Sequence, residues 1–476
     1  MKPKLKIFQD FVASLLPHEL IYLHGIHQFQ DTENIDILQR MYRWVVEGQK
    51  QPFDDSIDKR KYSAIIQWVN HKLAAVDVDI AFEQASELDR RIMTDTVDAA
   101  IEKQLMQLLR TDASAYYFMR YYELLRNYRQ YLLIRMRFKE HRQVNDWLEQ
   151  HAGAFERAQR DYQRLHAATL ELTQAYQAGQ LPSQDWAREL GDLFLDASRD
   201  GLNRYLALVR LTFWHYNQRS YEQLLPFFDA LESAFTRGQF YSKRLLMNYY
   251  SNRLLLHAQL DQLPEAAAYG YLSVRNRNAD YVYYLTNLSA VLLRQHKARE
   301  AMELLRKAFP DLKQSTSFHT RTSFVAHYVR CLNETGQPQE GEKYAENFVN
   351  AYKEEVFEQR WHLLYTNYLQ ALLMQKKFAK LIRTVRLNKL MERELDYRKR
   401  RHYSPALSWY YAIARFHEGQ IEKEDLRKAV DASLESLLSD VHRRTHLLQL
   451  CDEVRKWAPD IFDKVRSGIL HDVVYS

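Results

Sequence analysis

Residues 116–142, YYFMRYYELLRNYRQYLLIRMRFKEHR, have a spacing of apolar and polar positions that predicts one long helix. At about 100° per residue, one helix face carries Tyr117, Tyr121, Leu124, Leu125, Tyr128 and Leu132. The opposite face carries Arg120, Glu123, Arg126, Gln130 and Arg137. A surface that stacks bases and holds phosphates needs rings and cations together. Their separation predicts an ordinary amphipathic helix with one buried face.

The same periodicity divides the chain into three regions. Residues 1–180 predict short helices followed by a long antiparallel helix pair over 113–178, with its turn near HRQVNDWLEQHAG. The polar stretch AGQLPSQDW then breaks the pattern, and its glycine and serine can end one helix and cap the next. Residues 181–440 predict repeated helix pairs, and residues 441–476 predict C-terminal capping helices.

The repeats are defined by five segments that end one helix, turn briefly and begin another. Equivalent positions in these segments are Ala266, Ala301, Gly341, Leu381 and Glu424. The spacings between them are 35, 40, 40 and 43 residues. A single helix pair of this length cannot bury its own apolar face, so the copies are expected to stack on one another.

These segments resemble the tetratricopeptide-repeat family over about residues 240–440. Asn287, Leu288 and Ser289 match the family's Asn-Leu-Gly, while Gly336 and Gly419 match its turn glycine. The spacing is longer than the family's 34 residues, and Leu381 and Glu424 replace a small residue. The resemblance implies a right-handed superhelix of antiparallel helix pairs, a tetratricopeptide-like α-solenoid, preceded by the N-terminal helical region.

Composition supports an all-α fold. The 476 residues include 12 glycines and 10 prolines, far fewer than the many turns of a β protein would need. Cys331 and Cys451 lie far apart, which predicts neither a disulfide framework nor a metal site. No run of 18 apolar residues occurs, so no membrane-spanning helix is expected. Asp10 interrupts the first apolar stretch, whereas a signal peptide has an uninterrupted apolar core. We therefore expect a cytoplasmic protein with no membrane partner.

Catalytic signatures are missing from the sequence. It contains no phosphate-binding loop, no dinucleotide fingerprint and no nucleophile elbow. The segment HELIYLH resembles a zinc-protease motif, but its two histidines are not one helical turn apart. His18 and Glu19 are instead expected to begin a helix after Pro17. The sequence predicts a non-enzymatic protein with no cofactor and no metal.

Positive charge is concentrated in residues 376–402. This basic run holds eleven Lys and Arg against three acids, a local charge of +8 within a chain of +6. Such a cluster can attract phosphates or an acidic partner, although charge runs on helices are also common as solvated faces. The candidate anion-binding or acidic-partner-binding residues are Lys376, Lys380, Arg383, Arg398, Lys399, Arg400 and Arg401.

A second candidate site follows from the resemblance. In the tetratricopeptide-repeat family, the first helix of each pair lines a concave groove, where an asparagine can hydrogen-bond an extended peptide or its terminal carboxylate. The candidate peptide-binding residues at such positions are Asn248, Asn252, Asn287, His327, Arg330 and Asn367. The alternative is that these side chains hydrogen-bond neighbouring helices or face water.

Two functions from different classes follow. The leading hypothesis is a protein-protein interaction scaffold that binds a peptide or protein segment in the groove of its repeats. The alternative is a nucleic-acid-binding or regulatory protein that uses the basic run, whose binding would weaken steeply with salt. An enzyme with an unfamiliar helical active site has no motif in its favour.

Overall fold

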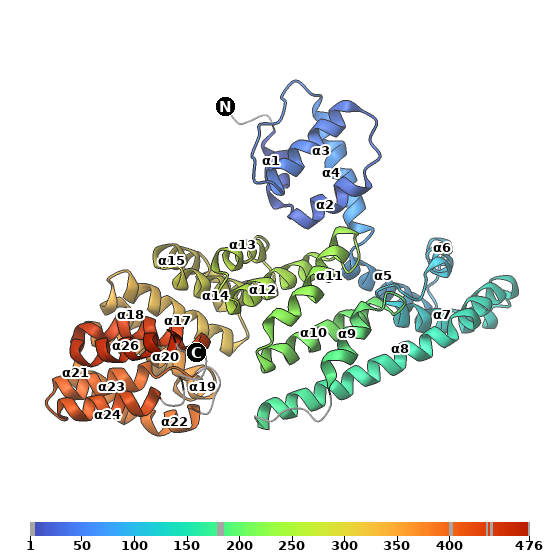
Figure 1. Ribbon diagram of the computed structural model, residues 1–476. Coiled ribbons are helices and arrows are strands. Elements are labelled where there is room, and N and C mark those ends of the chain that lie inside the picture. Colours follow the sequence, from blue (N-terminus) through green and yellow to red (C-terminus); the bar gives the residue numbers. More distant parts are fainter. Residues whose placement is uncertain (1–4, 179–184, 399–402, 435–436, 438–440, 475–476) are drawn as a thin grey trace. The chain divides into compact units, whose positions relative to one another are not determined.

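The computed structural model of this protein (Figure 1) describes residues 5–178, 185–398, 403–434, 437 and 441–474. These residues form helices α1 to α26 and three short 3₁₀ helices, and the described ranges contain no strand. The prediction of an all-α fold is confirmed for them. Among them, no helix is both long and apolar enough to cross a bilayer. The chain divides into two compact units, Met1–Gln262 and Leu263–Ser476.

The first unit contains twelve of the α-helices described. They are α1 (Lys6–Ser14), α2 (Pro17–Ile26), α3 (Thr32–Val45), α4 (Lys59–Ala74), α5 (Val78–Met93), α6 (Ala99–Gln107), α7 (Phe118–Ile134), α8 (Phe138–Ala178), α9 (Trp186–Leu195), α10 (Gly201–Gln218), α11 (Leu225–Thr236) and α12 (Lys243–Gln259). Several begin with an aspartate whose carboxylate accepts hydrogen bonds from the first backbone N–H groups, as at Asp31, Asp77 and Asp98.

Helices α7 and α8 form the long antiparallel hairpin that the sequence predicted, but the predicted turn was wrong. The chain reverses at Arg135–Arg137, and the stretch HRQVNDWLEQHAG lies inside α8. Met136 adopts a left-handed φ of 56°, and the N–H of Arg137 bonds the carbonyl of Leu132 to close the turn. A methionine in this conformation leaves no glycine or proline signal in the sequence.

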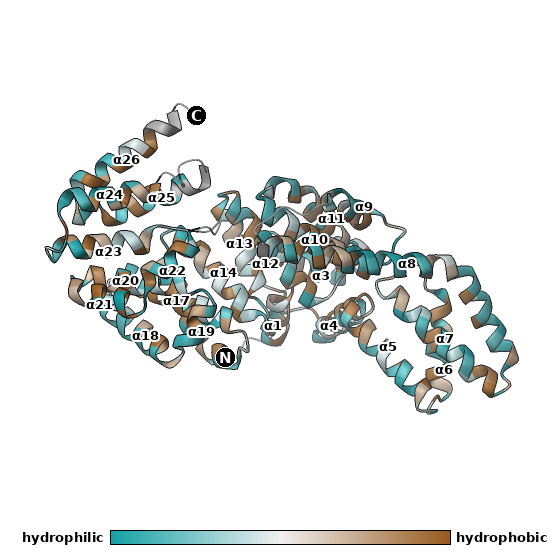
Figure 2. Ribbon diagram, turned by 90° about the horizontal axis from the view of Figure 1, so that it is seen from below, coloured by the Kyte–Doolittle hydropathy of each residue, from teal (hydrophilic) through white to brown (hydrophobic). Residues whose placement is uncertain are grey.

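The buried face of α7 is close to the predicted one. Leu124, Leu125, Tyr128 and Leu132 are buried, but Tyr117 and Tyr121 are only half-buried. Phe118 and Tyr122 fill the core in their place, and the ring of Tyr122 stacks on Phe155 of α8 at 4.1 Å. The buried face of α7 is therefore rotated slightly from the predicted one, toward α8. Figure 2 shows the alternation of hydrophilic and hydrophobic residues along both helices.

The domain boundary expected at residues 179–184 lies outside the described residues. Helix α10 packs against both α8 and α9, so the helices on either side of this stretch share one core. Arg199 pairs with Asp161 of α8 at 2.6 Å, and the Asn203 amide donates to the carbonyl of Ala158. The two compact units of the chain meet after Gln262 in the sequence.

A buried polar network fastens α2 to α11 and α12 in the first unit. His18 and Glu19 begin α2 after Pro17, as predicted. The His18 ring bonds the Tyr250 hydroxyl at 2.7 Å and Glu232 at 3.3 Å. The Tyr241 hydroxyl donates to Glu19 at 2.6 Å. Burial raises the pKa of Glu19, and these partners compensate its removal from water.

The second unit contains the remaining helices. They are α13 (Leu263–Ser273), α14 (Tyr281–Arg294), α15 (Ala298–Lys307), α16 (Phe309–Gln314), α17 (Phe318–Glu334), α18 (Pro338–Ala351), α19 (Lys353–Glu358), α20 (Trp361–Met374), α21 (Phe378–Leu387), α22 (Leu390–Tyr397), α23 (Ala406–His417), α24 (Lys423–Leu434), α25 (Val441–Val454) and α26 (Pro459–Val474). From α13 to α24, each long helix packs against the next long helix along the chain, and the alternate helices α14, α17, α20 and α23 also contact one another in that order.

The turns inside the helix pairs repeat at the spacing found in the sequence. A left-handed residue recurs at Asp261, His296, Gly336, Lys376 and Gly419. Each of these residues lies five positions before one of the five equivalent positions named above. In each turn the following N–H bonds a carbonyl five residues earlier, for example Lys377 to Leu372. The two glycines predicted for turns are confirmed, but three of the five turns use a residue with a Cβ.

Lys376→Gly is expected to stabilise the chain by roughly 1 kcal/mol, because a left-handed φ is costly for a residue with a Cβ. Lys376 has a φ of 58° and an exposed side chain. Urea denaturation measures the change. Gly336→Ala at the equivalent turn, where φ is 79°, should have the opposite sign. Equal stability of all three proteins would contradict the expectation.

The small-residue position of each pair is buried in three of the copies as expected, and Leu381 is also buried. Glu424 is exposed, so the predicted equivalence is wrong for the last copy. Helix α24 begins four residues after its left-handed Gly419, whereas α15, α18 and α21 begin two residues after theirs. The extra two residues move the packing position to Leu426, which is fully buried.

Candidate functional site

The first helices of three successive pairs in the second unit, α14, α17 and α20, are buried on nearly all sides. Their neighbours before and after in the chain cover two sides, and the second helix of each pair covers a third. On α14 the only accessible residues are Tyr283, Asn287, Ala290 and Arg294, which follow one another at helical spacing. This helix therefore presents a single narrow stripe.

Corresponding stripes run along the other two helices. We call the whole set the first-helix stripe. It consists of Tyr283, Asn287, Ala290 and Arg294 on α14, His327, Arg330 and Glu334 on α17, and Leu363, Thr366, Gln370 and Met374 on α20. Gln370 is the least accessible member. Because α17 contacts both α14 and α20, the three rows are neighbours.

His327 is a neutral imidazole at the centre of this stripe. Burial, with the positive charges of Arg330 and Arg360, lowers the pKa of His327 to about 4. The ring is hydrogen-bonded to the backbone at Thr286, while its buried Nδ1 has no partner among the described residues. With one nitrogen donating to a carbonyl, the other is an acceptor.

Asn367 does not line the stripe, contrary to the prediction. Its side chain is buried, and its amide nitrogen donates to the carbonyls of Ala326 at 3.0 Å and Leu363 at 3.1 Å. The amide joins α20 to α17, which is the structural alternative that the sequence left open. Leu363 and Thr366 occupy the accessible positions before it, while Gln370 after it is buried.

In the first unit, α12 carries a stripe of the same kind. Asn248, Asn252, Leu255 and Gln259 are its accessible residues at helical spacing. The Asn252 amide donates to Asn248 Oδ1 at 2.8 Å, and the Tyr205 hydroxyl donates to the same oxygen. The two predicted asparagines are therefore half-buried and bonded to each other.

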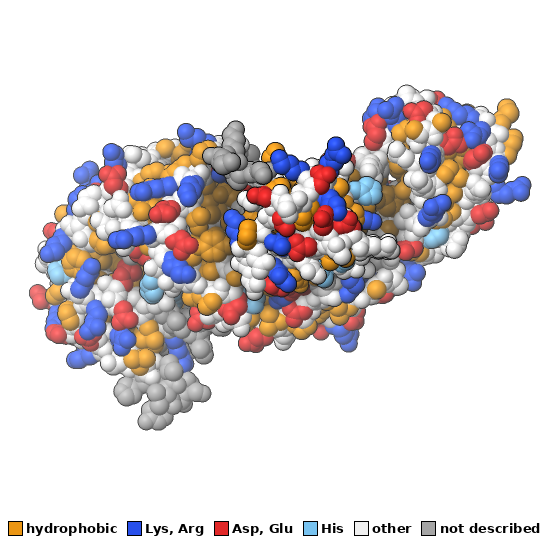
Figure 3. Space-filling view, turned by 90° about the horizontal axis from the view of Figure 1, so that it is seen from above, with side chains coloured by type: hydrophobic (Ala, Val, Ile, Leu, Met, Phe, Trp, Pro, Cys, Tyr) orange, Lys and Arg blue, Asp and Glu red, His pale blue; other side chains and the backbone are white. Residues whose placement is uncertain are grey.

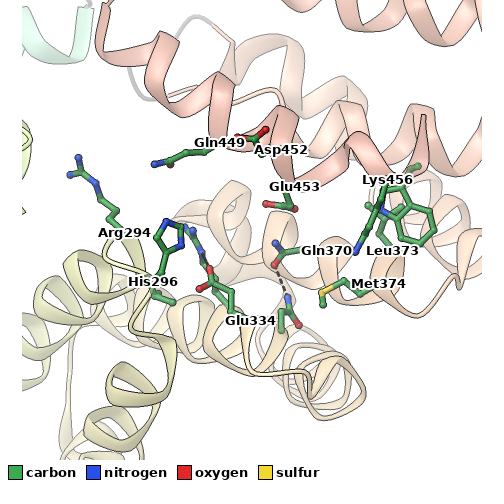
Figure 4. Close-up of a pocket in the computed structure, with 14 residues that line it drawn as sticks. Arg294, His296, Glu334, Gln370, Leu373, Met374, Gln449, Asp452, Glu453 and Lys456 are labelled. Carbon is green, nitrogen blue, oxygen red and sulfur yellow. Dashed lines mark hydrogen bonds and ion pairs between the residues drawn. The ribbon is translucent and has the colours of Figure 1, made fainter. Parts of the chain in front are cut away.

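The first-helix stripe ends at a cavity of about 320 Å³ that is lined by both charged and apolar side chains (Figure 4). One wall consists of the C-terminal ends of the first helices, with Arg294, His296, Arg330, Glu334, Gln370 and Met374. The other wall is supplied by α25 and the 3₁₀ helix that follows it, with Gln449, Asp452, Glu453, Lys456 and Trp457. The close-up shows α25 lying across the cavity from α17 and α20.

Charges of both signs line this cavity, and several are already paired. Arg330 bonds Glu334 at 2.7 Å, and Asp452 accepts a bond from Arg466 at 2.8 Å. The Tyr410 hydroxyl donates to Glu453. The cavity therefore combines apolar side chains with charges of both signs, and neither sign is in strong excess, which suits a peptide segment better than a lone anion.

The basic run is largely accessible, but one of its predicted anion-binding residues is engaged elsewhere. The Lys380 ammonium lies 2.8 Å from Glu342 and 3.0 Å from Glu346, both on α18. Lys377 also bonds Glu342, at 2.6 Å. Although burial alone would raise the pKa of Glu342, these bonds lower it. The prediction for Lys380 is corrected accordingly: it fastens α21 to α18.

The other predicted cations are more widely distributed. Arg383 is exposed beside a shallow hollow that it shares with Arg386 and Leu387. Lys376 and Arg398 are also exposed. Lys399, Arg400 and Arg401 lie outside the described residues. Figure 3 shows Lys and Arg side chains interspersed with Asp and Glu over the face it displays.

Several site residues were missed from the sequence. Arg294 lies seven residues after Asn287, so extending the period along α14 would have found it. Thr366 lies one residue from the predicted Asn367, on a different face of α20, so the predicted phase of that helix was wrong. The contribution of α25 had no sequence signal, because it depends on how the C-terminal helices fold against the pairs.

No protein-family model matches this chain, and neither the curated proteins nor the solved structures contain a match.

Proposed function

We propose that this chain is a non-enzymatic, cytoplasmic interaction scaffold that binds an extended segment of a partner protein along the first-helix stripe. In this proposal the helix pairs form a tetratricopeptide-like, right-handed α-solenoid with the stripe on its concave side. The recurrence of left-handed turn residues at the repeat spacing supports this arrangement. The missing catalytic signatures agree with a non-enzymatic role.

The observation that carries the proposal is the composition of the stripe. Asn287 carries both a donor and an acceptor, and His327 offers an acceptor. The Thr366 hydroxyl keeps an acceptor after donating to the His362 carbonyl at 2.7 Å, and the Gln370 amide keeps its donor nitrogen after accepting from Asn333 at 2.8 Å. An extended peptide presents alternating N–H and C=O groups, which such side chains can pair from several neighbouring helices. The cavity at the end of the stripe has room for one further side chain or terminus of that segment.

The triple variant Asn287→Ala, Arg330→Ala, Thr366→Ala should weaken partner binding by about tenfold or more, because contacts near the centre of an interface dominate affinity. Affinity capture from the host lysate identifies the partner, and titration of that purified partner gives the affinity. Circular dichroism verifies that the variant remains folded.

A matched control variant carries Glu303→Ala, Lys343→Ala and Asn347→Ala, three exposed side chains on the second helices α15 and α18. It should bind like the original protein. Equal affinity of the two triple variants would refute the stripe as the binding surface. Capture that disappears with nuclease or at higher salt would instead favour the basic run and a nucleic acid.

A further inference from the structure

The turn between α7 and α8 exposes an unusual number of large apolar side chains. Leu133, Ile134, Met136 and Phe138 have exposed fractions between 47% and 75% within six residues of chain. Nothing in the hairpin core requires them, because Tyr128, Leu132 and Val144 already fill it. We call these four residues, together with Met93, the hairpin tip.

Met93 belongs to the tip because ion pairs bring the end of α5 to this turn. Arg135 bonds Asp95 at 2.7 Å, two residues after Met93, which is 70% exposed. Arg137 bonds Glu102 of α6 at 2.5 Å and Glu140 at 3.2 Å. These pairs hold the tip in shape and occupy its nearby acids.

The cations that remain give the tip a positive rim. Lys103, Lys139 and Arg142 are exposed, and no ion pair is found for them in the described ranges. Asp95, Glu102 and Glu140 are all engaged by Arg135 and Arg137. The tip therefore has an apolar end and a ring of unpaired cations around it. Such a tip is complementary to a surface with a negatively charged outer layer and an apolar interior.

The conformation of the turn does not explain why its residues are apolar. Met136 holds a left-handed φ of 56°, where glycine would be the least strained choice. The same conformation occurs at His296 and Lys376, so it belongs to the turn, but an exposed methionine there is unfavourable for solubility.

We propose that the hairpin tip inserts into the surface layer of an anionic lipid membrane. The tip would place its apolar side chains below the headgroups and its rim of cations among them. In Figure 3, hydrophobic side chains lie beside Lys and Arg at the end of the view where α6, α7 and α8 lie in Figure 1. Self-association through this tip is disfavoured because both copies would bring the same positive rim. A five-residue tip is too short for a hydropathy window, which is why the sequence predicted no membrane partner.

Vesicle co-sedimentation tests the insertion, using phosphatidylcholine vesicles with and without added phosphatidylserine. The full chain should bind the phosphatidylserine vesicles, and binding to phosphatidylcholine alone should be several-fold weaker. Ile134→Ser with Met136→Ser should reduce binding by about tenfold or more, since two buried apolar side chains are lost. Lys139→Glu with Arg142→Glu should abolish the preference for phosphatidylserine.

The matched control is Leu387→Ser with Leu395→Ser, two similarly exposed leucines of the second unit, and it should bind like the original protein. Failure of the full chain to bind either vesicle, or equal binding of the Ile134/Met136 and control variants, would overturn the inference. Crosslinking of residue 134 to a protein, without vesicle binding, would assign the tip to an apolar groove of a protein partner. None of these outcomes depends on the first-helix stripe, so this test and that of the proposed function can fail separately.

Discussion

Gly341→Leu is expected to destabilise the chain by about 3 kcal/mol, through overpacking and the loss of a buried hydrogen bond. A Cβ at residue 341 would lie 2.7 Å from Oδ1 of Asn333. That buried side chain cannot give way freely, because its Nδ2 donates to the Asn367 carbonyl at 2.9 Å and to Gln370 at 2.8 Å. Urea denaturation followed by circular dichroism measures the loss.

Gly468→Leu is the matched control, since a Cβ on this helical glycine of α26 meets no atom within 4 Å. It should leave the stability unchanged or slightly improved, because leucine favours a helix over glycine. An unchanged denaturation midpoint for Gly341→Leu would mean that α18 can shift away from α17. The equivalent Leu381 is accommodated in its own pair, so position in the repeat alone does not decide which residue fits.

Glu394→Gln is expected to stabilise the chain at pH 8 by about 3 kcal/mol while changing little near pH 4. Glu394 is fully buried, and burial raises its pKa from 4.5 to about 7. Because the folded-state pKa is the higher one, the native state binds the proton more tightly. The stabilisation that comes from keeping Glu394 protonated is fully present below pH 4.5 and is lost as the pH rises through 7. Glutamine keeps an acceptor for the Tyr403 hydroxyl, which donates to Glu394 at 2.8 Å, but carries no charge.

Denaturation midpoints of both proteins between pH 4 and pH 8 provide the measurement. Glu392→Gln, an exposed substitution two residues earlier on α22, controls for the change in net charge. Parallel pH profiles for Glu394→Gln and the original protein would show that the carboxyl is solvated in the native state and that its pKa is not raised.

Helical periodicity predicted most of the fold, because buried faces leave a local record in the sequence. On α7 it located four of the six buried side chains, and the repeat spacing of 35 to 43 residues recurs in the left-handed turns. It failed where no local signal exists. Met136 turns the hairpin without glycine or proline, and a longer connection before α24 moved the packing position from Glu424 to Leu426.

Candidate sites were harder to predict than helices, because a polar residue at the right helical phase can face either solvent or a neighbouring helix. Asn367 lies one residue from the accessible Thr366, yet its side-chain amide donates hydrogen bonds to two backbone carbonyls of the core. Lys380 belongs to a basic run, yet its ammonium is paired with Glu346 and Glu342, which lie 34 and 38 residues earlier in the chain. Such partners are known only once the helices are assembled.

The narrow accessible surface of α14, α17 and α20 also limits how this chain can change over evolutionary time. Most substitutions on these helices would disturb a packed neighbour, so they are constrained by stability whatever the partner. The accessible positions, most of which belong to the stripe, can vary with less of that penalty. A new binding preference would therefore arise through few positions, such as Asn287, Arg330 and Thr366, while the rest of each first helix remains fixed by packing.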